Sequence, residues 1–331
     1  HAKKNAHFLA ADGSRVTRED SCAGYVSQME CYADFGFFPR KDDRYWESPF
    51  TSYTYDKYAY EDACRESVLG KRTYTLCDSL TATDASYLVE PVDGLWLLAI
   101  DGGVYLPKEM KDGKWTYQGS SAGYNLVLKH KPFLLPWVRK VVEEARKRHK
   151  TLVAFSHYPL VDFNDGVSES VRRMWGNRRF DLHRVPEAEV SEAFLQAGLR
   201  LHFAGHMHVN DTGIWEGKDG KHLYNIQVPS IATYVPAYKI LTIESDEAFR
   251  VETVTLDTVP GFDSLFPLYR AEYQSDSLRG HLPVWNKEIL SARTYGEFCD
   301  YQFRDLVRLR FIPRDLPESW RACWILPVPG Y

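Results

Sequence analysis

Long apolar runs, an excess of one charge and closely paired cysteines are all missing from this 331-residue sequence. No apolar run approaches the roughly 18 residues of a membrane-spanning helix, so we expect no membrane span. The 41 Lys and Arg residues nearly balance the 45 Asp and Glu residues, and a net charge of −4 offers no basic surface to nucleic acid. The six cysteines include no Cys-x-x-Cys pair, which favours free buried thiols and a reducing compartment, the cytoplasm, over a disulfide framework.

The sequence does contain the alternation of helices and strands that builds an α/β fold. Apolar residues make up 44% of the chain and charged residues 26%, as in ordinary globular proteins. Two strands separated by a Pro-Val-Asp-Gly turn predict a hairpin, at 85–90 and 95–100. Two helices each lead into a strand, with expected ranges of 136–146 into 151–155 and 186–197 into 199–203. This order predicts a layered α/β sandwich.

One of these strands ends at two histidines. Apolar and polar residues alternate from Leu199 to Phe203, which is the period of a strand. Gly205 then marks a turn, and His206 and His208 follow, one residue apart. Imidazole is a good ligand for Zn, Mn and Fe, so Gly-His-x-His at a strand end is a candidate metal-binding arrangement. Two neighbouring histidines are equally compatible with a solvated loop.

A second strand also runs into a histidine. Residues 151–155 form a short apolar run, and the sequence Ser156-His157-Tyr158-Pro159 follows directly. In open α/β sheets, ligands bind beyond the carboxyl ends of such strands. His157 is therefore a third candidate ligand.

These two segments resemble the carboxyl-terminal half of the calcineurin-like metallophosphoesterase superfamily, whose members hold two metal ions. The match is carried by His157-Tyr158-Pro159 and by Gly205-His206-Met207-His208, and it covers roughly residues 95–244. The resemblance implies an α/β/β/α sandwich of mixed sheets flanked by helices. It also implies that His157 and His206 ligate one metal and that His208 ligates the other. Asp101 is similar to the family's Asp after a central strand.

The chain departs from that family at its amino-terminal end. Family members begin with Asp-x-His on the first strand, followed by Gly-Asp-x-x-Asp and Gly-Asn-His-Asp/Glu motifs, and this sequence has none of them in that position. Its only Asp-x-His, Asp181-Leu182-His183, lies between the two histidine strands. We therefore expect the sandwich, residues 1–256, to be incomplete at its amino terminus, and a mainly helical extension to occupy 257–331. A signal peptide would be lost with such a segment, so export stays open.

Other candidates have weaker support. Asn210 and Asp211 follow the histidine pair closely enough to contact substrate or the metal ligands. The family resemblance makes Asp101 and Tyr234 candidates for the same kind of contact. Strands at 229–234 and 238–243 are expected to continue the sheet. Several Arg residues between 172 and 179 could bind phosphate, but solvent exposure is the simpler interpretation. The Tyr-rich segment 45–60 is either an aromatic lid over substrate or a surface excursion packed by its own rings. His202 is expected to be exposed, and neither it nor His222 is expected to be a ligand.

The resemblance implies hydrolysis of a small-molecule phosphate ester through two divalent ions, Mn, Fe or Zn, which activate a hydroxide and neutralise the phosphoryl oxygens. Three imidazoles cannot balance two dications without carboxylates, so the chain as given is expected to be inactive or impaired, and no catalytic acid or base is assigned. The alternative is a non-catalytic interaction module with at most one metal. A mononuclear three-His zinc hydrolase is a third possibility, and it lacks an identifiable general base.

Overall fold

The computed structural model describes residues 8–9, 15–16, 25–77, 80–111, 113–118, 123–245, 248–278 and 285–316. The chain divides into two compact units, each of which is described by itself. The first unit comprises His1–Leu160, Pro186–His202 and Glu216–Leu223, and the second comprises Val161–Val185, Phe203–Trp215 and Tyr224–Tyr331. The predicted division at residue 256 stays a prediction.

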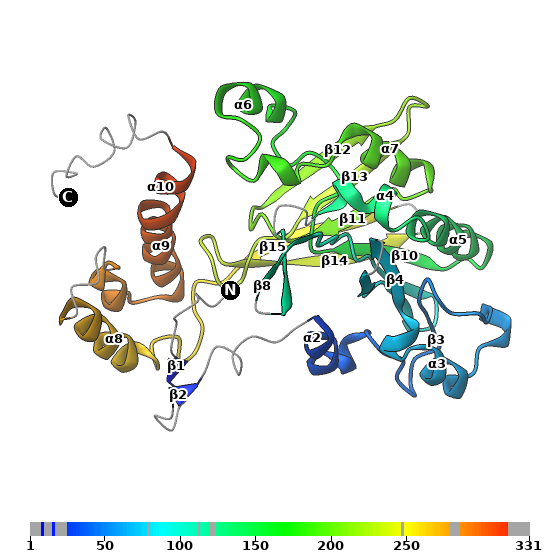
Figure 1. The fold of residues 1–331 in the computed structure, drawn as a ribbon, viewed down its shortest axis with the longest axis horizontal. Coiled ribbons are helices and arrows are strands. Elements are labelled where there is room, and N and C mark those ends of the chain that lie inside the picture. Colours follow the sequence, from blue (N-terminus) through cyan, green and yellow to red (C-terminus); the bar gives the residue numbers. More distant parts are fainter. Residues whose placement is uncertain are drawn as a thin grey trace. The chain divides into compact units, whose positions relative to one another are not determined.

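A mixed sheet flanked by helices forms the centre of the α/β fold (Figure 1). Its seven strands have the order β12-β13-β11-β10-β7-β6-β3. Their bounds are Asp211–Glu216, His222–Gln227, Leu201–Ala204, Thr151–Ser156, Leu95–Ala99, Tyr87–Val92 and Tyr45–Glu47, in that order. Strand β7 pairs antiparallel with β6, as the predicted hairpin requires, and parallel with β10.

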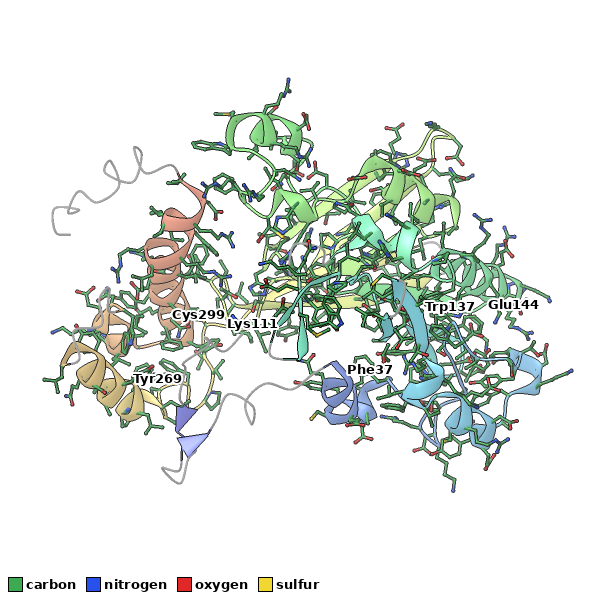
Figure 2. The ribbon with its side chains drawn as sticks, viewed as in Figure 1. Phe37, Lys111, Trp137, Glu144, Tyr269 and Cys299 are labelled. Carbon is green, nitrogen blue, oxygen red and sulfur yellow. The ribbon has the colours of Figure 1, made fainter. Side chains whose placement is uncertain are left out.

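The helices of the first unit follow from their sequence periodicity. Helix α5, Leu134–Lys147, places buried apolar side chains at Leu134, Trp137, Val138, Val141 and Ala145, and this spacing makes one continuous stripe. The charged residues occupy the other side of the helix, and α5 lies against β10 (Figure 1). Figure 2 labels Trp137 and Glu144 on this helix. The other helices of the unit are α2, Tyr25–Cys31; α3, Tyr60–Glu66; α4, Val127–His130; and α7, Ala188–Gln196.

Small hairpins occupy segments for which the sequence predicted no strands. In the first unit β4, Thr73–Cys77, pairs with β5, Leu80–Thr83. Strands β8, Pro107–Lys111, and β9, Lys114–Tyr117, pair within the segment that follows Asp101. Because these strands are short, their periodicity gave no signal. Strands β1, Phe8–Leu9, and β2, Arg15–Val16, also pair with each other.

The Tyr-rich segment is packed by its own rings. The ring of Tyr45 lies 5.2 Å from that of Tyr58, 4.9 Å from that of Tyr55 and 5.9 Å from that of Trp96. Tyr45 is buried, and its hydroxyl donates to the buried Glu47 carboxylate at 2.6 Å. Such contacts favour the packed surface excursion over a lid.

The second unit contains the long hairpin β14, Ala237–Ser245, with β15, Ala248–Thr255, and several helices. The helices are α6, Ser168–Trp175; α8, Phe266–Leu278; α9, Tyr295–Leu306, continued by a π-helical turn, Val307–Phe311; and α10, Ile312–Asp315. Phe266, Ile289, Phe298 and Cys299 form a buried core between the helices of the 266–306 region. The prediction that 229–234 and 238–243 continue the central sheet is wrong: the first segment is not a strand, and β14 pairs only with β15 among the described strands.

Two further expectations can be compared with the described residues. The cysteines described, Cys31, Cys64, Cys77 and Cys299, are all free, and of these only Cys299 is buried. No helix in the described ranges is both long enough and apolar enough to cross a membrane. The sequence Thr17-Arg18-Glu19-Asp20 also predicts a helix start, with Thr17 as the N-cap, and this segment lies outside the described residues.

Candidate functional site

The parallel pair β7 and β10 brings two predicted site residues to one edge of the sheet. The pairing aligns Leu95 with Thr151 and Ala99 with Phe155, so both strands end at the same level. The chain then continues into Asp101 after β7 and His157 after β10. This is the edge where open α/β sheets bind ligands.

A cavity of about 420 Å³ lies at this edge, wholly within the first unit. Its walls include Asp101, Ser156, His157, Tyr105 and Gly102. Its volume is within the range of small-molecule sites. Gly102 is required by close packing, because a Cβ there would lie 2.7 Å from the buried ring of Tyr124. The cavity thus gathers a carboxylate, a hydroxyl and an exposed imidazole.

The Asp101 carboxylate is held in place by three donors. Lys131 Nζ lies 2.9 Å from Oδ2, the Ala85 amide donates to the same oxygen at 3.2 Å, and the Gly103 amide donates to Oδ1 at 3.0 Å. Lys131 also donates to the Asp101 carbonyl at 2.7 Å and to Asp84 Oδ2 at 2.8 Å. Asp101 therefore cannot rotate freely, and its charge is partly neutralised before any ligand enters.

Lys131 and Asp84 form a fully buried ion pair beneath this edge. Burial lowers the pKa of Lys131, but the negative charges of Asp101 and Asp84 outweigh it, and the net effect is to raise that pKa. Lys131 is consequently charged throughout the physiological range. Sequence reasoning missed this pair because its members lie 47 residues apart in segments without a recognisable motif.

Ser156 and His202 form a second polar contact beside the cavity. His202 Nε2 lies 3.0 Å from Ser156 Oγ, and Ser156 Oγ donates to the Tyr158 carbonyl at 2.6 Å. The hydroxyl proton is therefore committed to a carbonyl, and His202 donates to the oxygen instead of removing a proton from it. The pair braces the turn that carries His157. The prediction that His202 is exposed is wrong. His202 and Ala204 lie on the buried face of β11, and the apolar Leu201 and Phe203 lie on the less buried face.

In the second unit, the turn after β11 holds two histidines in an unusual backbone conformation. His206 has φ = 63° and His208 has φ = 57°, both in the left-handed region. The Met207 amide donates to the Gly205 carbonyl at 2.7 Å, and Met207 packs against the small core of Phe163, Leu182 and Val185. Non-glycine residues in this region carry strain and concentrate at functional sites.

Each of these histidines has a side-chain partner within the second unit. His208 Nδ1 lies 3.0 Å from Thr233 Oγ1, and the residue is otherwise exposed. Arg184 Nη1 lies 2.6 Å from His206 Nε2, so the guanidinium donates to that nitrogen and the imidazole is neutral there. The sequence gave no signal for Arg184, which lies 22 residues before His206.

The other predicted site residues of the second unit, Asn210, Asp211 and Tyr234, make structural contacts. Both Lys239 and Thr253 donate to the Asn210 amide oxygen, Thr253 at 3.1 Å, which ties the residue to the β14–β15 hairpin. Asp211 begins β12 and attracts the Lys239 ammonium. Tyr234 is 45% exposed, and its ring stacks on Phe303 at 6.5 Å.

The donor set does not fit two metal ions. Among the described residues, no group of three or more His, Cys, Asp or Glu side chains could hold a metal ion. His157 belongs to the first unit, and His206 and His208 belong to the second. The guanidinium on His206 Nε2 also puts a positive charge at a nitrogen expected to bind a cation. The described side chains therefore do not bring together the ligands of a two-metal centre.

Comparison with solved structures includes a distant similarity to a phosphatase. No family model and no curated protein match the sequence. Among solved structures, the crystal structure of a dimetal phosphatase from Danio rerio aligns with 52% of this chain and 60% of its own length, at 14% identity and a TM-score of 0.29. The alignment thus spans less than two thirds of that phosphatase. A similarity this low does not establish the fold or the function.

Proposed function

We propose that this chain carries part of the site of a metal-dependent phosphoester hydrolase, with His206 and His208 of the second unit as imidazole ligands. His157, a further ligand by the family resemblance, belongs to the first unit. The observation that carries the proposal is the left-handed conformation of both His206 and His208 in the turn that ends β11. Asp101 and His157 at one cavity, at the ends of two parallel strands, support it. The family resemblance of the sequence supplies the reaction class.

Within this proposal, the chain's own residues orient and bind. Thr233 holds His208 through Nδ1, which directs Nε2 outward as the ligating nitrogen. Arg184 brings a guanidinium to the same turn, where it pairs with phosphoryl oxygens once a phosphate ester is bound. Because no group of three or more His, Cys, Asp or Glu side chains among the described residues could hold a metal ion, we expect the chain alone to hydrolyse phosphate esters poorly.

The test compares His208→Ala with His149→Ala. His149 is exposed and has φ = 53°, close to the 57° of His208, so both substitutions place Ala in the same strained region and should cost similar stability. After incubation with Mn or Zn and desalting, metal is counted by mass spectrometry. We expect His208→Ala to lose metal relative to the wild-type protein and His149→Ala to keep it.

Equal metal contents in the wild-type protein and both variants would contradict the ligand role of His208. Hydrolysis of p-nitrophenyl phosphate is measured on the same samples. Fast turnover by the wild-type chain would contradict its expected impairment and would mean that carboxylate ligands come from residues not assigned to the site.

One observation favours the alternative, a non-catalytic interaction module. Arg184 occupies the very nitrogen of His206 that would ligate metal. If the chain binds no metal in this experiment, and Arg184→Gln does not restore binding, the module is the better description of this chain.

A further inference from the structure

The second unit contains a cavity of about 480 Å³, larger than the one beside Asp101, to which no role is assigned above. It lies among helix α8, the short 3-10 helix Lys287–Ser291, helix α9 and the segment at residues 232–233. All of these elements belong to one compact unit. The volume suits a drug-sized or smaller organic ligand.

Aromatic rings dominate the chemistry of this cavity. Tyr269, Trp285, Phe298 and Phe303 all line it, together with aliphatic side chains from the same helices. One of these rings, that of Phe298, also belongs to the buried core of the unit, and packing therefore fixes its position. Rings held in this way offer flat faces to a flat apolar ligand at little entropic cost.

The polar groups of the cavity bias it against anions. Glu272 and Asp305 both line it, and Asp305 is committed to the Asn286 amide at 2.8 Å and to the Arg308 guanidinium at 2.6 Å. Neither Arg308 nor any Lys lines the cavity. A negatively charged ligand would face Glu272 without a compensating cation, whereas a neutral or positively charged ring is accepted and also attracted by the ring faces.

This cavity adjoins the turn that carries His208. Thr233 lines the cavity, and its hydroxyl lies 3.0 Å from His208 Nδ1. The segment around Thr233 is fixed to α9 by a hydrogen bond from the Tyr295 hydroxyl to the Ile231 carbonyl, 2.7 Å long, and by the stacking of Tyr234 on Phe303. A molecule that reaches from His208 past Thr233 therefore enters the aromatic cavity.

We propose that the cavity binds the alcohol portion of the phosphate ester, and that this portion is an apolar, ring-bearing group that is neutral or positively charged. The assignment to an ester rests on the proposed function. The phosphate stays at the His208 turn, beside Arg184, and the ring occupies the space between α8 and α9. Selectivity among esters then comes from the helical part of the second unit.

The experiment measures binding of β-naphthol, 6-hydroxy-2-naphthoate and glycerol to the full chain by calorimetry. β-Naphthol is expected to bind saturably. The naphthoate, whose carboxylate lies at the far end of the ring and would enter the cavity, should bind about tenfold more weakly, and glycerol should not bind detectably. Binding of these ligands can be measured without bound metal and without catalysis. The binding result therefore stands apart from the metal and phosphatase tests, and either can fail without the other.

Two Gln→Trp variants localise the binding. Gln302 on α9 is exposed and lines the cavity, and Gln274 on α8 is exposed and does not line it. Gln302→Trp fills the opening and is expected to weaken β-naphthol binding about tenfold or more, whereas Gln274→Trp should change it by less than about twofold. Equal effects of the two variants, or no saturable binding to the wild-type protein, would overturn the proposal.

A competition experiment tests the assignment to the ester. β-Naphthyl phosphate should displace β-naphthol from the wild-type protein, because the ring of the ester occupies the same cavity. Failure of the ester to compete would overturn its assignment to this cavity.

Discussion

Replacing Lys131 by Met tests the buried charge network that holds Asp101. Methionine has a similar length and no charge, so the substitution keeps most of the packing and removes the ammonium. It leaves the carboxylates of Asp84, fully buried, and Asp101, 12% exposed, without their shared cation. Two like charges then face each other in a region with little access to water.

The expected cost follows from that geometry. Removing one partner of a buried ion pair costs about 3–5 kcal/mol, because the remaining charge stays desolvated. For a unit of this size, about 2–4 °C of melting temperature are lost per kcal/mol, so the midpoint should fall by roughly 6–20 °C. The double variant with Asp84→Asn removes one of the stranded carboxylates and should recover at least about 1 kcal/mol.

The assay is thermal unfolding followed by tryptophan fluorescence, with Lys221→Met as the matched control in the same unit. Lys221 pairs with Asp219, and their side chains are 53% and 35% exposed, so this loss should cost at most about 0.5 kcal/mol. The reasoning is refuted if Lys131→Met and Lys221→Met shift the midpoint equally. It is also refuted if the double variant is less stable than Lys131→Met.

Two further predictions concern packing and buried hydroxyls. Gly102→Ala should destabilise the protein by about 1–3 kcal/mol, because its Cβ would lie 2.7 Å from the buried Tyr124 ring. Gly70→Ala, whose Cβ would have no atom within 4 Å, should cost under about 0.5 kcal/mol. Equal urea midpoints of the two variants would contradict this prediction. Tyr45→Phe removes a hydrogen bond to a buried carboxylate and should cost about 1–3 kcal/mol of unfolding free energy. The buried Tyr58 hydroxyl has no partner among the described residues, so Tyr58→Phe should be neutral or stabilising. Burial raises the pKa of Tyr58 from 10.0 to about 12. Between these values the unfolded chain has lost the proton and the folded chain keeps it, so stability falls as pH rises, and Tyr58→Phe should reduce that fall in alkaline unfolding curves.

Local patterns were sufficient where an element depends on its own periodicity. The apolar runs of β7 and β10 and the stripe of α5 were predicted close to their observed bounds. The stripe of α5 has the period of a helix, and the apolar runs of β7 and β10 have the length of a buried strand and are too short for a buried helix. The hairpins β4–β5 and β8–β9 were missed because their strands are only four or five residues long, too short for a clear period.

Tertiary context reversed two local interpretations. His202 alternates with apolar neighbours as an exposed strand residue would, yet it is fully buried, because β11 buries the face of His202 more deeply than the face of Leu201 and Phe203. The segment 229–234 has strand-like composition but forms turns, tied by the Tyr295 hydroxyl to the Ile231 carbonyl. Neither outcome could be read from a window of neighbouring residues, since the deciding contacts are distant in sequence.

By itself, the sequence determined which strands end in histidine, and it named His157, His206 and His208 as the residues to examine. The tertiary structure alone decided what surrounds them. The pairing of β7 with β10 brought Asp101 to the cavity of His157, and folding placed Lys131 beneath Asp101 and Arg184 on His206. Spacing along the chain fixes local conformation, but the charges and rings that reach a site come from segments tens of residues away, and only the fold brings them there.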